Sequence, residues 1–443
     1  MPTIRQTVRR SGRLTALARG VRDAIRGAPA AGSTSAPQSA TAAVAARDGL
    51  DGVAELHRVG PKRDAAAAAG PRLNLLVPTL SPARAFGGTR TALDLFEALA
   101  PRFPRLRIVA FQPIPDAALA SLEGYVRANP GDEGAPDRVA VAVPRGPGAE
   151  PQLAVGPGDV FLATFWTTAE LATRLVRWQA ATFGGEPRPH AYLIQDFEPG
   201  FYPWSAQSEL ARTTYTGDVP PVAVINSRLL ADYLAGQGIA LDDPLTFEPR
   251  IDARLRPFLA EPARERVRRI VVYGRPETPR NAFPVLVDGL RSWVAGGGGG
   301  GWEVVSAGRS HPPVELGRGL RMRSVGKLEI EAYGSLLRES ALGVSLMVSP
   351  HPSYPPLDMA HLGLRVVTNT FGPKDLSSWH ENIVSAAAMT AGAIADAIAR
   401  QAAAFEADPA AGDRARPLRP DYVADGPIFP FADTLAERLG AGL

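Results

Sequence analysis

Short apolar segments alternate with helical stretches along most of the chain, and this alternation limits the choice of fold more than any other feature. The first series of apolar segments lies at 73–80, 106–111, 139–143, 160–165, 191–195 and 222–226. Buried strands of a parallel sheet have this length and composition, because helices cover both faces of such a sheet. Helices are expected near 89–100, 116–128, 169–181 and 227–235. The pattern therefore predicts an α/β domain with a doubly wound sheet.

A second series of the same kind follows a Pro- and Arg-rich stretch at 249–265. Its predicted strands lie at 270–274, 302–307, 342–347 and 365–369, and its predicted helices at 281–294, 330–339 and 355–362. The 443 residues suffice for two domains of ordinary size. Two doubly wound domains that face each other bind a ligand in the cleft at the carboxyl ends of their strands.

The N-terminal segment differs from the rest of the chain in composition. Residues 1–70 combine an Arg-rich start with an Ala-, Ser-, Gly- and Pro-rich stretch, which is typical of disorder. Leu14, Leu17, Val21 and Ile25 follow a helical spacing among arginines. A basic amphipathic helix of this kind predicts peripheral membrane contact through residues 1–28, and the alternative is a solvated tail. We expect domains at 71–250 and 251–415 and a C-terminal segment at 416–443.

Composition excludes several classes of function. Cysteine is absent, which removes disulfides, thiolate nucleophiles and thiolate metal sites. The formal net charge is only +3, so nucleic acid is not an expected partner. No apolar run approaches the roughly 20 residues of a membrane span. A cytoplasmic protein is expected, at the inner face of the plasma membrane if the tail binds lipid. Only three lysines stand against 45 arginines, so each lysine merits attention.

Five sequence strings together resemble a known family. They are FGGTRTALDL (86–95), YLIQDFEPGFYPWSAQSELARTTY (192–215), YGRPETPRN (273–281), a segment at 324–369 that contains SPHPSYPPLDMA, and GPKDLSSWHEN (372–382). These strings resemble GT-B glycosyltransferases of family 4 type, most closely the WsaF-type rhamnosyltransferases of bacterial surface-glycan synthesis. The resemblance covers residues 72–405.

The resemblance implies a fold and an activity. The fold would be GT-B, with two facing Rossmann-like domains, a cleft between them, and a C-terminal helix that crosses back onto the first domain. The activity would be metal-independent transfer of L-rhamnose from dTDP-L-rhamnose to a growing, lipid-linked or free, surface polysaccharide. No cofactor is expected beyond this nucleotide-sugar donor.

Two arginines follow the predicted strand at 270–274. Arg275 and Arg280 are five residues apart at the carboxyl end of this strand, and guanidinium groups match the oxygens of a phosphate. The resemblance implies that both hold the donor diphosphate, with Arg280 at a position where the family usually has lysine. The alternative is a pair of solvated loop arginines.

The SPHPSYPPLDMA string places polar residues before a helix that its prolines would open. The helix N-terminus can meet phosphate or sugar hydroxyls. The resemblance puts Pro350 and Asp358 where the family has two glutamates, so Asp358 would hold a ribose hydroxyl and His351 would replace the lost glutamate. Alternatively, His351 caps its own turn. The donor-binding candidates of this string are Ser349, His351, Ser353, Tyr354 and Asp358.

Glycine turns supply further candidates. Gly326 and Lys327 follow a strand where, by the resemblance, backbone groups contact the base of the donor. Lys327 is then either a bystander or a phosphate contact, and the rarity of lysine in this chain favours the contact. Gly87 and Gly88 precede a helix in the first domain and would let the backbone approach a ligand. Ordinary strand-to-helix packing explains this second pair nearly as well.

The catalytic candidates are Asp196 and Glu198. In an extended segment, residues i and i+2 point the same way, so both carboxylates would face the cleft after the strand at 191–195. Acceptor or sugar binding, to which a base function could be added, is the preferred role, and N-capping with loop hydrogen bonds by Asp196 is the alternative. A metal site is disfavoured because hard cations need more oxygen ligands. The nearby Tyr202, Pro203 and Trp204 could either stack on a sugar or pack in the core.

Two other functions compete with glycosyl transfer. A nucleotide-sugar 2-epimerase of GT-B fold would need strong acid and base carboxylates near the sugar, and the missing glutamate at Pro350 argues against it. A catalytically degenerate nucleotide-sugar-binding module in a polysaccharide assembly complex is compatible with both departures from the family pattern.

Overall fold

The computed structural model describes residues 53, 56–64, 70–81, 87–130, 136–143, 151–261 and 265–440. The chain divides into two units, residues 1–52 and 53–443, and the description below concerns the second. The amphipathic helix predicted around Leu14 to Ile25 lies outside the described residues.

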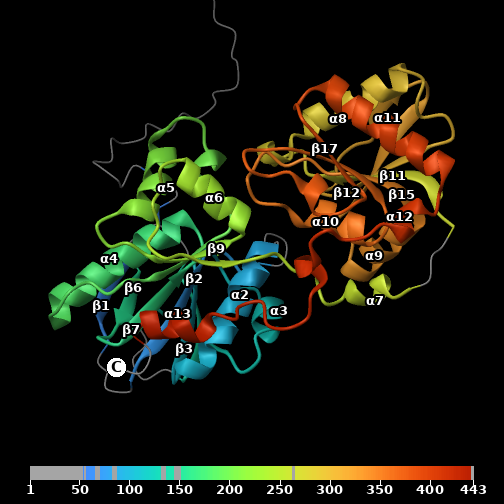
Figure 1. Ribbon diagram of the computed structural model, residues 1–443. Helices are drawn as coiled ribbons and strands as arrows, with labels where there is room; N and C mark the ends of the chain where they lie inside the picture. Colours follow the sequence, from blue (N-terminus) through green and yellow to red (C-terminus); the bar gives the residue numbers. More distant parts are fainter. Residues whose placement is uncertain are drawn as a thin grey trace, which may run out of the picture. The chain divides into compact units, whose positions relative to one another are not determined.

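The first large sheet has eight strands in the order β10-β9-β8-β7-β2-β3-β5-β4, and its paired strands all run parallel (Figure 1). Its strands are β2 (Arg72–Val77), β3 (Arg105–Ala110), β4 (Val126–Ala128), β5 (Arg138–Ala142), β7 (Asp159–Ala163), β8 (Ala191–Ile194), β9 (Val222–Asn226) and β10 (Leu245–Phe247). The chain builds outward from β2 in one direction and then in the other, as in a doubly wound sheet.

Helices cover both faces of this sheet, which explains why every residue of the central strands β2, β3 and β7 is buried. Along β2, Leu75 packs in one core with Phe96, and the next residue, Leu76, packs in a second core with Leu175. The helices are α2 (Gly87–Leu99), α3 (Asp116–Ala120), α4 (Trp166–Phe183), α5 (Ala206–Thr216) and α6 (Arg228–Gly236), with the 3-10 helices η3 (Ala100–Arg102) and η4 (Glu198–Phe201).

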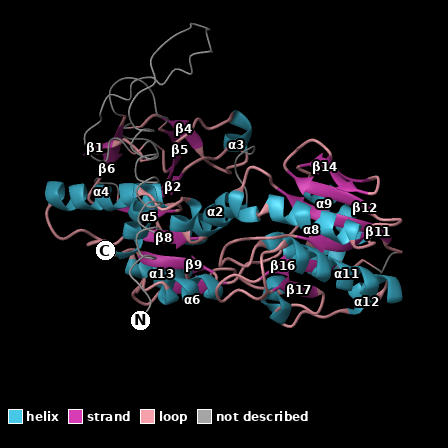
Figure 2. Ribbon diagram, turned by 90° about the horizontal axis from the view of Figure 1, so that it is seen from above, coloured by secondary structure: helices cyan, strands magenta, loops and turns pink. Residues whose placement is uncertain are grey.

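One predicted element of this half is wrong. The helix expected at 116–128 ends at Ala120, and the edge strand β4 takes up the last part of that range. Gly124 lies between them with φ +78°, a left-handed conformation that suits glycine and breaks the helix. A small separate sheet also joins β1 (Gly60–Arg63) to β6 (Gln152–Val155) (Figure 2).

The second large sheet has seven strands in the order β13-β14-β12-β11-β15-β16-β17. Its strands are β11 (Val267–Gly274), β12 (Glu303–Gly308), β13 (Val314–Gly317), β14 (Leu320–Gly326), β15 (Ser340–Val344), β16 (Arg365–Asn369) and β17 (Ile383–Ala386). Only the β13–β14 pair is antiparallel. After β14 the chain returns to the other side of β11, so the order of the strands reverses between β11 and β15, where such folds bind ligands.

The helices and 3-10 helices of this half are η5 (Pro279–Asn281), α7 (Arg256–Leu259), α8 (Phe283–Ala295), α9 (Ile330–Glu339), α10 (Tyr354–His361), η6 (Leu376–Ser378), α11 (Ala391–Ala407), α12 (Ala411–Arg414) and η7 (Pro420–Val423). Helices α8 and α11 pack closely because Gly289 has no side chain: a Cβ there would lie 2.5 Å from Cγ2 of Ile394. The two parallel sheets confirm the predicted α/β fold class.

The last helix belongs to the core of the first sheet. Helix α13 (Ala432–Arg438) contacts α2 (Figure 1). Leu435 and Leu439 are buried in the same core as Phe96. Helix α13 therefore packs on the first sheet, although it follows the second sheet in the sequence.

Candidate active site

Four loops of the site begin where parallel strands end. Asp196 follows β8 of the first sheet, whereas Arg280, Ser349 and Lys374 follow β11, β15 and β16 of the second. Parallel strands all end at the same edge of a sheet, so side chains from distant parts of the sequence can meet there. We refer to these four residues as the Asp196 cluster.

Asp196 joins the two halves of the chain within this cluster. Its Oδ1 accepts a hydrogen bond from the Ser349 hydroxyl, and its Oδ2 lies 3.5 Å from Nε of Arg280. Burial raises the pKa of Asp196, and the positive charge of Arg280 and the Ser349 hydrogen bond oppose this rise. Burial therefore destabilises the ionised form of Asp196, and the neighbouring Arg280 guanidinium offsets part of this destabilisation.

Glu198 does not share the environment of Asp196, which corrects the expectation that both face one cleft. Residue 198 begins the 3-10 helix η4, so the segment is not extended and the i, i+2 rule does not apply. The residue is 2% exposed, and its Oε2 accepts hydrogen bonds from the Trp166 amide at 2.5 Å and the Tyr192 hydroxyl at 2.6 Å. Burial raises the pKa of Glu198 to about 8. Glu198 thus holds the first turn of α4.

The two arginines of the 273–281 string have different carboxylate neighbours. The Arg280 guanidinium lies 4.5 Å from the ring centre of Phe201, beside Asp196. Nε of Arg275 lies 4.0 Å from Oε1 of Glu277, which also pairs with Nε of Arg309 at 3.0 Å. The string therefore holds two cationic positions: Arg280 is paired with a carboxylate from the first half of the chain, and Arg275 lies near a carboxylate of the string itself.

The loop before α10 folds on itself through its polar residues. The His351 amide donates to the Ser349 hydroxyl at 3.0 Å, and the Ser353 amide donates to Nδ1 of His351 at 3.0 Å. His351 therefore caps its own turn, as one of the two predicted alternatives has it. Burial and the charges of Lys374 and Arg280 lower the pKa of His351 to about 3, so the imidazole is neutral and Nδ1 is free of a proton.

Two residues of α10 are bound by side chains from elsewhere. The Tyr354 hydroxyl accepts a hydrogen bond from Nδ2 of Asn226 at 3.2 Å. Oδ1 of Asp358 accepts a hydrogen bond from the Tyr422 hydroxyl at 2.5 Å, and burial raises the pKa of Asp358 to about 7. Ser353, which precedes the helix, is buried and has φ +70°. Asp358, which was predicted to hold a ribose hydroxyl, thus already accepts a short hydrogen bond from Tyr422.

Sequence reasoning did not select Lys374 as a site residue. The residue is 1% exposed, and its ammonium group donates to the Met347 carbonyl at 2.6 Å. Burial lowers the pKa of Lys374 to about 7, and the Asp196 carboxylate opposes this shift. The scarcity of lysine and the GPKDLSSWHEN string were the available signals. A buried lysine beside the Ser349 loop therefore comes from the loop after β16, which carried no predicted site residue.

Of the two candidate glycine turns, the one that contains Gly87 and Gly88 lies next to the Asp196 cluster. A Cβ on Gly88 would lie 3.3 Å from the amide of Gln195, whose Nε2 donates to the Gly88 carbonyl at 3.0 Å. The start of α2, which comprises Gly87 and Gly88, is therefore adjacent to the residue before Asp196. Gly326 has φ +69°, and Lys327 is exposed on the same turn at the end of β14.

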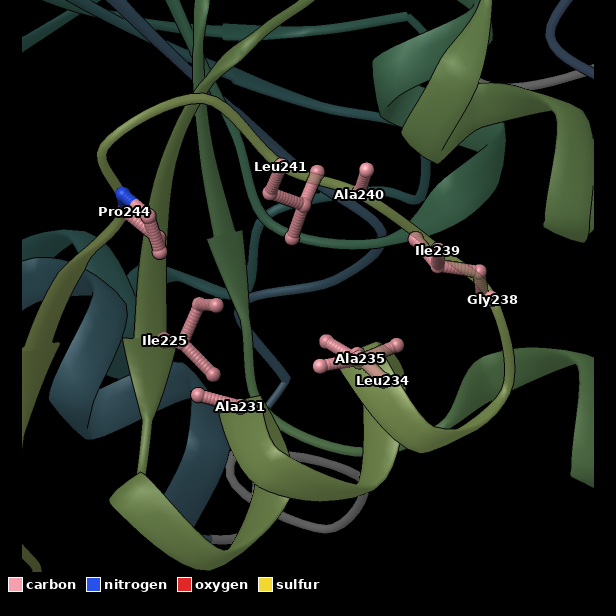
Figure 3. A pocket seen from close by; sticks show the side chains of 9 residues that line it. All are labelled: Ile225, Ala231, Leu234, Ala235, Gly238, Ile239, Ala240, Leu241 and Pro244. Atoms are coloured by element: carbon pink, nitrogen blue, oxygen red, sulfur yellow. The ribbon is translucent and has the colours of Figure 1, made fainter.

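A pocket in the first half of the chain is separate from these polar residues. It lies between α6 and the loop that leads to β10, and its lining is apolar (Figure 3). The lining residues are Ile225, Ala231, Leu234, Ala235, Gly238, Ile239, Ala240, Leu241 and Pro244. Side chains of this kind cannot transfer protons or bind phosphate.

Two features are absent from the residues that the structure describes. No three His, Asp or Glu side chains in this part of the chain are grouped so that they could hold a metal ion. Within the same residues, no helix is both long enough and apolar enough to cross a membrane.

Comparisons with known proteins relate the chain to one family. Residues 72–228 match the model of the WsaF N-terminal domain, and residues 268–399 match that of the WsaF C-terminal domain. The O-antigen biosynthesis protein RfbC of Myxococcus xanthus is 34% identical over 213 residues, which are 48% of this chain. The chain spans only 15% of the length of that relative.

Solved structures show the same fold at low sequence identity. WaaG, a glycosyltransferase involved in lipopolysaccharide biosynthesis, is 11% identical with a TM-score of 0.50, over 84% of this chain and 100% of WaaG. Trehalose-6-phosphate synthase OtsA is 10% identical with a TM-score of 0.50, over 83% of this chain and 98% of OtsA. These similarities concern the fold alone.

Proposed function

Because the chain belongs to the WsaF-type GT-B glycosyltransferases, we propose that it transfers a sugar from a nucleotide diphosphate donor to a glycan acceptor. The product would extend a bacterial surface polysaccharide, a process in which the Myxococcus xanthus relative is also named. The donor we propose is dTDP-L-rhamnose, and the acceptor is a free or lipid-linked glycan at the cytoplasmic side of the membrane.

The Asp196 cluster is the observation that carries this proposal. A carboxylate from the first sheet meets a guanidinium, a hydroxyl and a buried ammonium-bearing loop from the second. Sugar transfer needs cations for the leaving diphosphate next to a group that can accept the proton of the acceptor hydroxyl. The cluster combines these two requirements.

The second sheet supplies the donor side of the mechanism. Negative charge grows on the diphosphate as the bond to the sugar breaks, and fixed positive groups stabilise that charge. This positive charge comes from Arg275, Arg280 and Lys374, and the N-terminus of α10 adds to it. In this arrangement a donor phosphate replaces Asp196 as the partner of Arg280. We propose that these groups act without a metal ion.

Asp196 supplies the acceptor side. Its pKa is raised by burial, which makes the carboxylate a stronger base than an exposed one. Once a donor phosphate engages Arg280, the carboxylate loses one of the neighbours that lower its pKa. Asp196 is then free to accept the proton of the attacking hydroxyl. Glu198 has no direct part, since its hydrogen bonds go to Trp166 and Tyr192.

A degenerate nucleotide-sugar-binding module is the second candidate. The observation in its favour is that position 350 is proline and that Asp358 is hydrogen-bonded to Tyr422. Such a module would bind nucleotide sugar without turning it over.

The test measures turnover of dTDP-L-rhamnose and UDP-glucose by the full chain, with and without an L-rhamnose tetrasaccharide. We expect release of dTDP and extension of the tetrasaccharide, and we expect both to persist in the presence of a chelator. Saturable binding of dTDP without turnover would instead support the binding module. Activity that a chelator abolishes and a divalent ion restores would refute the metal-free mechanism.

A further inference from the structure

Trp204 is 99% exposed, which is unusual for the side chain that gains most from burial. Four of the six tryptophans are buried, namely Trp166, Trp293, Trp302 and Trp379, and Trp178 is partly buried. The sequence allowed two roles for the 202–204 loop, packing in the core or stacking on a sugar. Tyr202 packs against a buried cluster, whereas Trp204 does not pack in the core.

The loop that carries Trp204 is fixed by side-chain contacts. The indole Nε1 of Trp166 donates to the Tyr202 hydroxyl at 2.8 Å, and the two rings meet edge to face. The Ser208 hydroxyl donates to the Pro199 carbonyl at 3.1 Å, and its amide donates to the Ser205 hydroxyl at 3.3 Å, which caps α5. A fixed support of this kind lowers the entropy cost of binding through Trp204.

The same loop reaches the Asp196 cluster. Phe201 lies under the Arg280 guanidinium at 4.5 Å and stacks on Phe165. Trp204 lies eight positions after Asp196, and four of the seven residues between them form the 3-10 helix η4. A chain of this length and shape places the Cα atoms of Asp196 and Trp204 at most about 24 Å apart.

We propose that Trp204 is a platform for a sugar ring of the acceptor glycan, an inference that rests on the proposed function. A pyranose has an apolar face of C–H groups, which stacks on the electron-rich face of an indole. A 6-deoxyhexose such as rhamnose adds a methyl group to this apolar surface. The neighbouring Ser205 and Gln207 offer polar groups to the hydroxyls at the rim of the ring.

The charge around the loop favours a glycan over a lipid surface. Residues 197–211 contain no lysine or arginine, and the one exposed carboxylate among them is Glu209. An aromatic residue that anchors a protein to anionic lipid is normally accompanied by basic residues. Trp204 lacks such residues in its own segment.

The experiment compares Trp204→Ala and Trp204→Phe with the full-length wild type, using dTDP-L-rhamnose as donor and an L-rhamnose tetrasaccharide as acceptor. We expect Trp204→Ala to raise the KM for the tetrasaccharide at least tenfold, while kcat and the donor KM stay within twofold. Trp204→Phe should restore most of the affinity, because a phenyl ring still stacks. The control is Leu418→Ala, which truncates another exposed apolar side chain and should change nothing.

A binding measurement locates the contact directly. The indole N–H resonance that disappears in Trp204→Phe should shift in the wild type on addition of the tetrasaccharide. An unchanged resonance, or an unchanged KM in Trp204→Ala, would overturn the inference even if the donor is turned over. Release of dTDP by the wild type in the presence of the tetrasaccharide tests the proposed function separately, and its absence would refute that function and this inference together.

Two other outcomes would also overturn the inference. Trp204→Ala could abolish sedimentation with vesicles of phosphatidylethanolamine and phosphatidylglycerol in a 3:1 ratio, which would identify a lipid contact. Alternatively, the substitution could dissociate an oligomer in sedimentation velocity, which would identify a contact between two copies of the chain.

Discussion

Replacing Glu198 by glutamine should stabilise the protein at neutral and alkaline pH and leave sugar transfer almost unchanged. Glu198 is buried, and burial raises its pKa to about 8 from an ordinary value of 4.5. The folded chain therefore keeps a proton on this side chain in a pH range where the unfolded chain has lost it. Stability is fully present below pH 4.5 and is lost as the pH rises towards 8.

The size of this effect follows from the pKa shift. Each unit of pKa corresponds to about 1.4 kcal/mol, so the wild type should lose on the order of 3 kcal/mol between pH 4.5 and 7. Another 1 to 2 kcal/mol, approximately, should be lost by pH 8. Glutamine has nearly the same shape, does not titrate, and can still accept hydrogen bonds from the Trp166 amide and the Tyr192 hydroxyl.

The assay is urea unfolding of the wild type and Glu198→Gln at pH 4, 6 and 8. We expect the two proteins to be similar at pH 4 and the difference to grow in favour of the variant at higher pH. A variant that is less stable than the wild type at pH 8 would show that Glu198 is ionised and that its charge is needed. A loss of turnover by 100-fold or more in a folded variant would return Glu198 to the catalytic residues.

Four further predictions concern the cluster and the tail. Asp196→Asn should lower turnover by about 10²- to 10⁴-fold with dTDP affinity nearly unchanged, and weaker dTDP binding with normal turnover would move Asp196 to the donor site. Arg275→Ala and Arg280→Ala should each cost about 2 to 4 kcal/mol of transition-state stabilisation in kcat/KM, and wild-type rates in both would refute the diphosphate role. In the wild type, kcat/KM for the donor should fall above a pH of about 7, where Lys374 loses its proton. Lys374→Met should remove this decrease at high pH. A variant that still shows the decrease would mean that another group causes it. Deleting residues 1–30 should abolish salt-sensitive sedimentation with anionic vesicles while transfer to a soluble acceptor persists, and equal sedimentation of both proteins would leave the tail without a membrane role.

The amino-acid sequence determined the fold class, because the signal was repeated and local. Most of the buried strands are short, mainly apolar segments next to helical stretches, and a sheet covered on both faces is the ordinary way to bury such segments. The error at 116–128 arose where the apolar residues are few and Gly124 breaks the helical periodicity. Site motifs such as the 273–281 and 349–360 strings were visible for a similar reason, since their residues are close in sequence.

The tertiary structure decided which side chains share an environment. Asp196 and Glu198 are two residues apart, yet one is paired with Arg280 and the other is buried beneath Trp166, because a 3-10 helix begins between them. Conversely, Asp196 meets Ser349 although 153 residues separate them. Neither composition nor spacing encodes such contacts, since they depend on the ends of different strands meeting.

The same reasoning applies to Lys374 and Trp204. The sequence shows a rare lysine and an aromatic loop, but burial turned the lysine into a group with a pKa near neutrality, and exposure left the tryptophan available to a ligand. Burial and exposure are properties of the packed chain, because solvent access to one side chain depends on every segment that covers it. The sequence therefore supplied the chemical groups, and the tertiary structure determined their protonation, their neighbours and their access to a substrate.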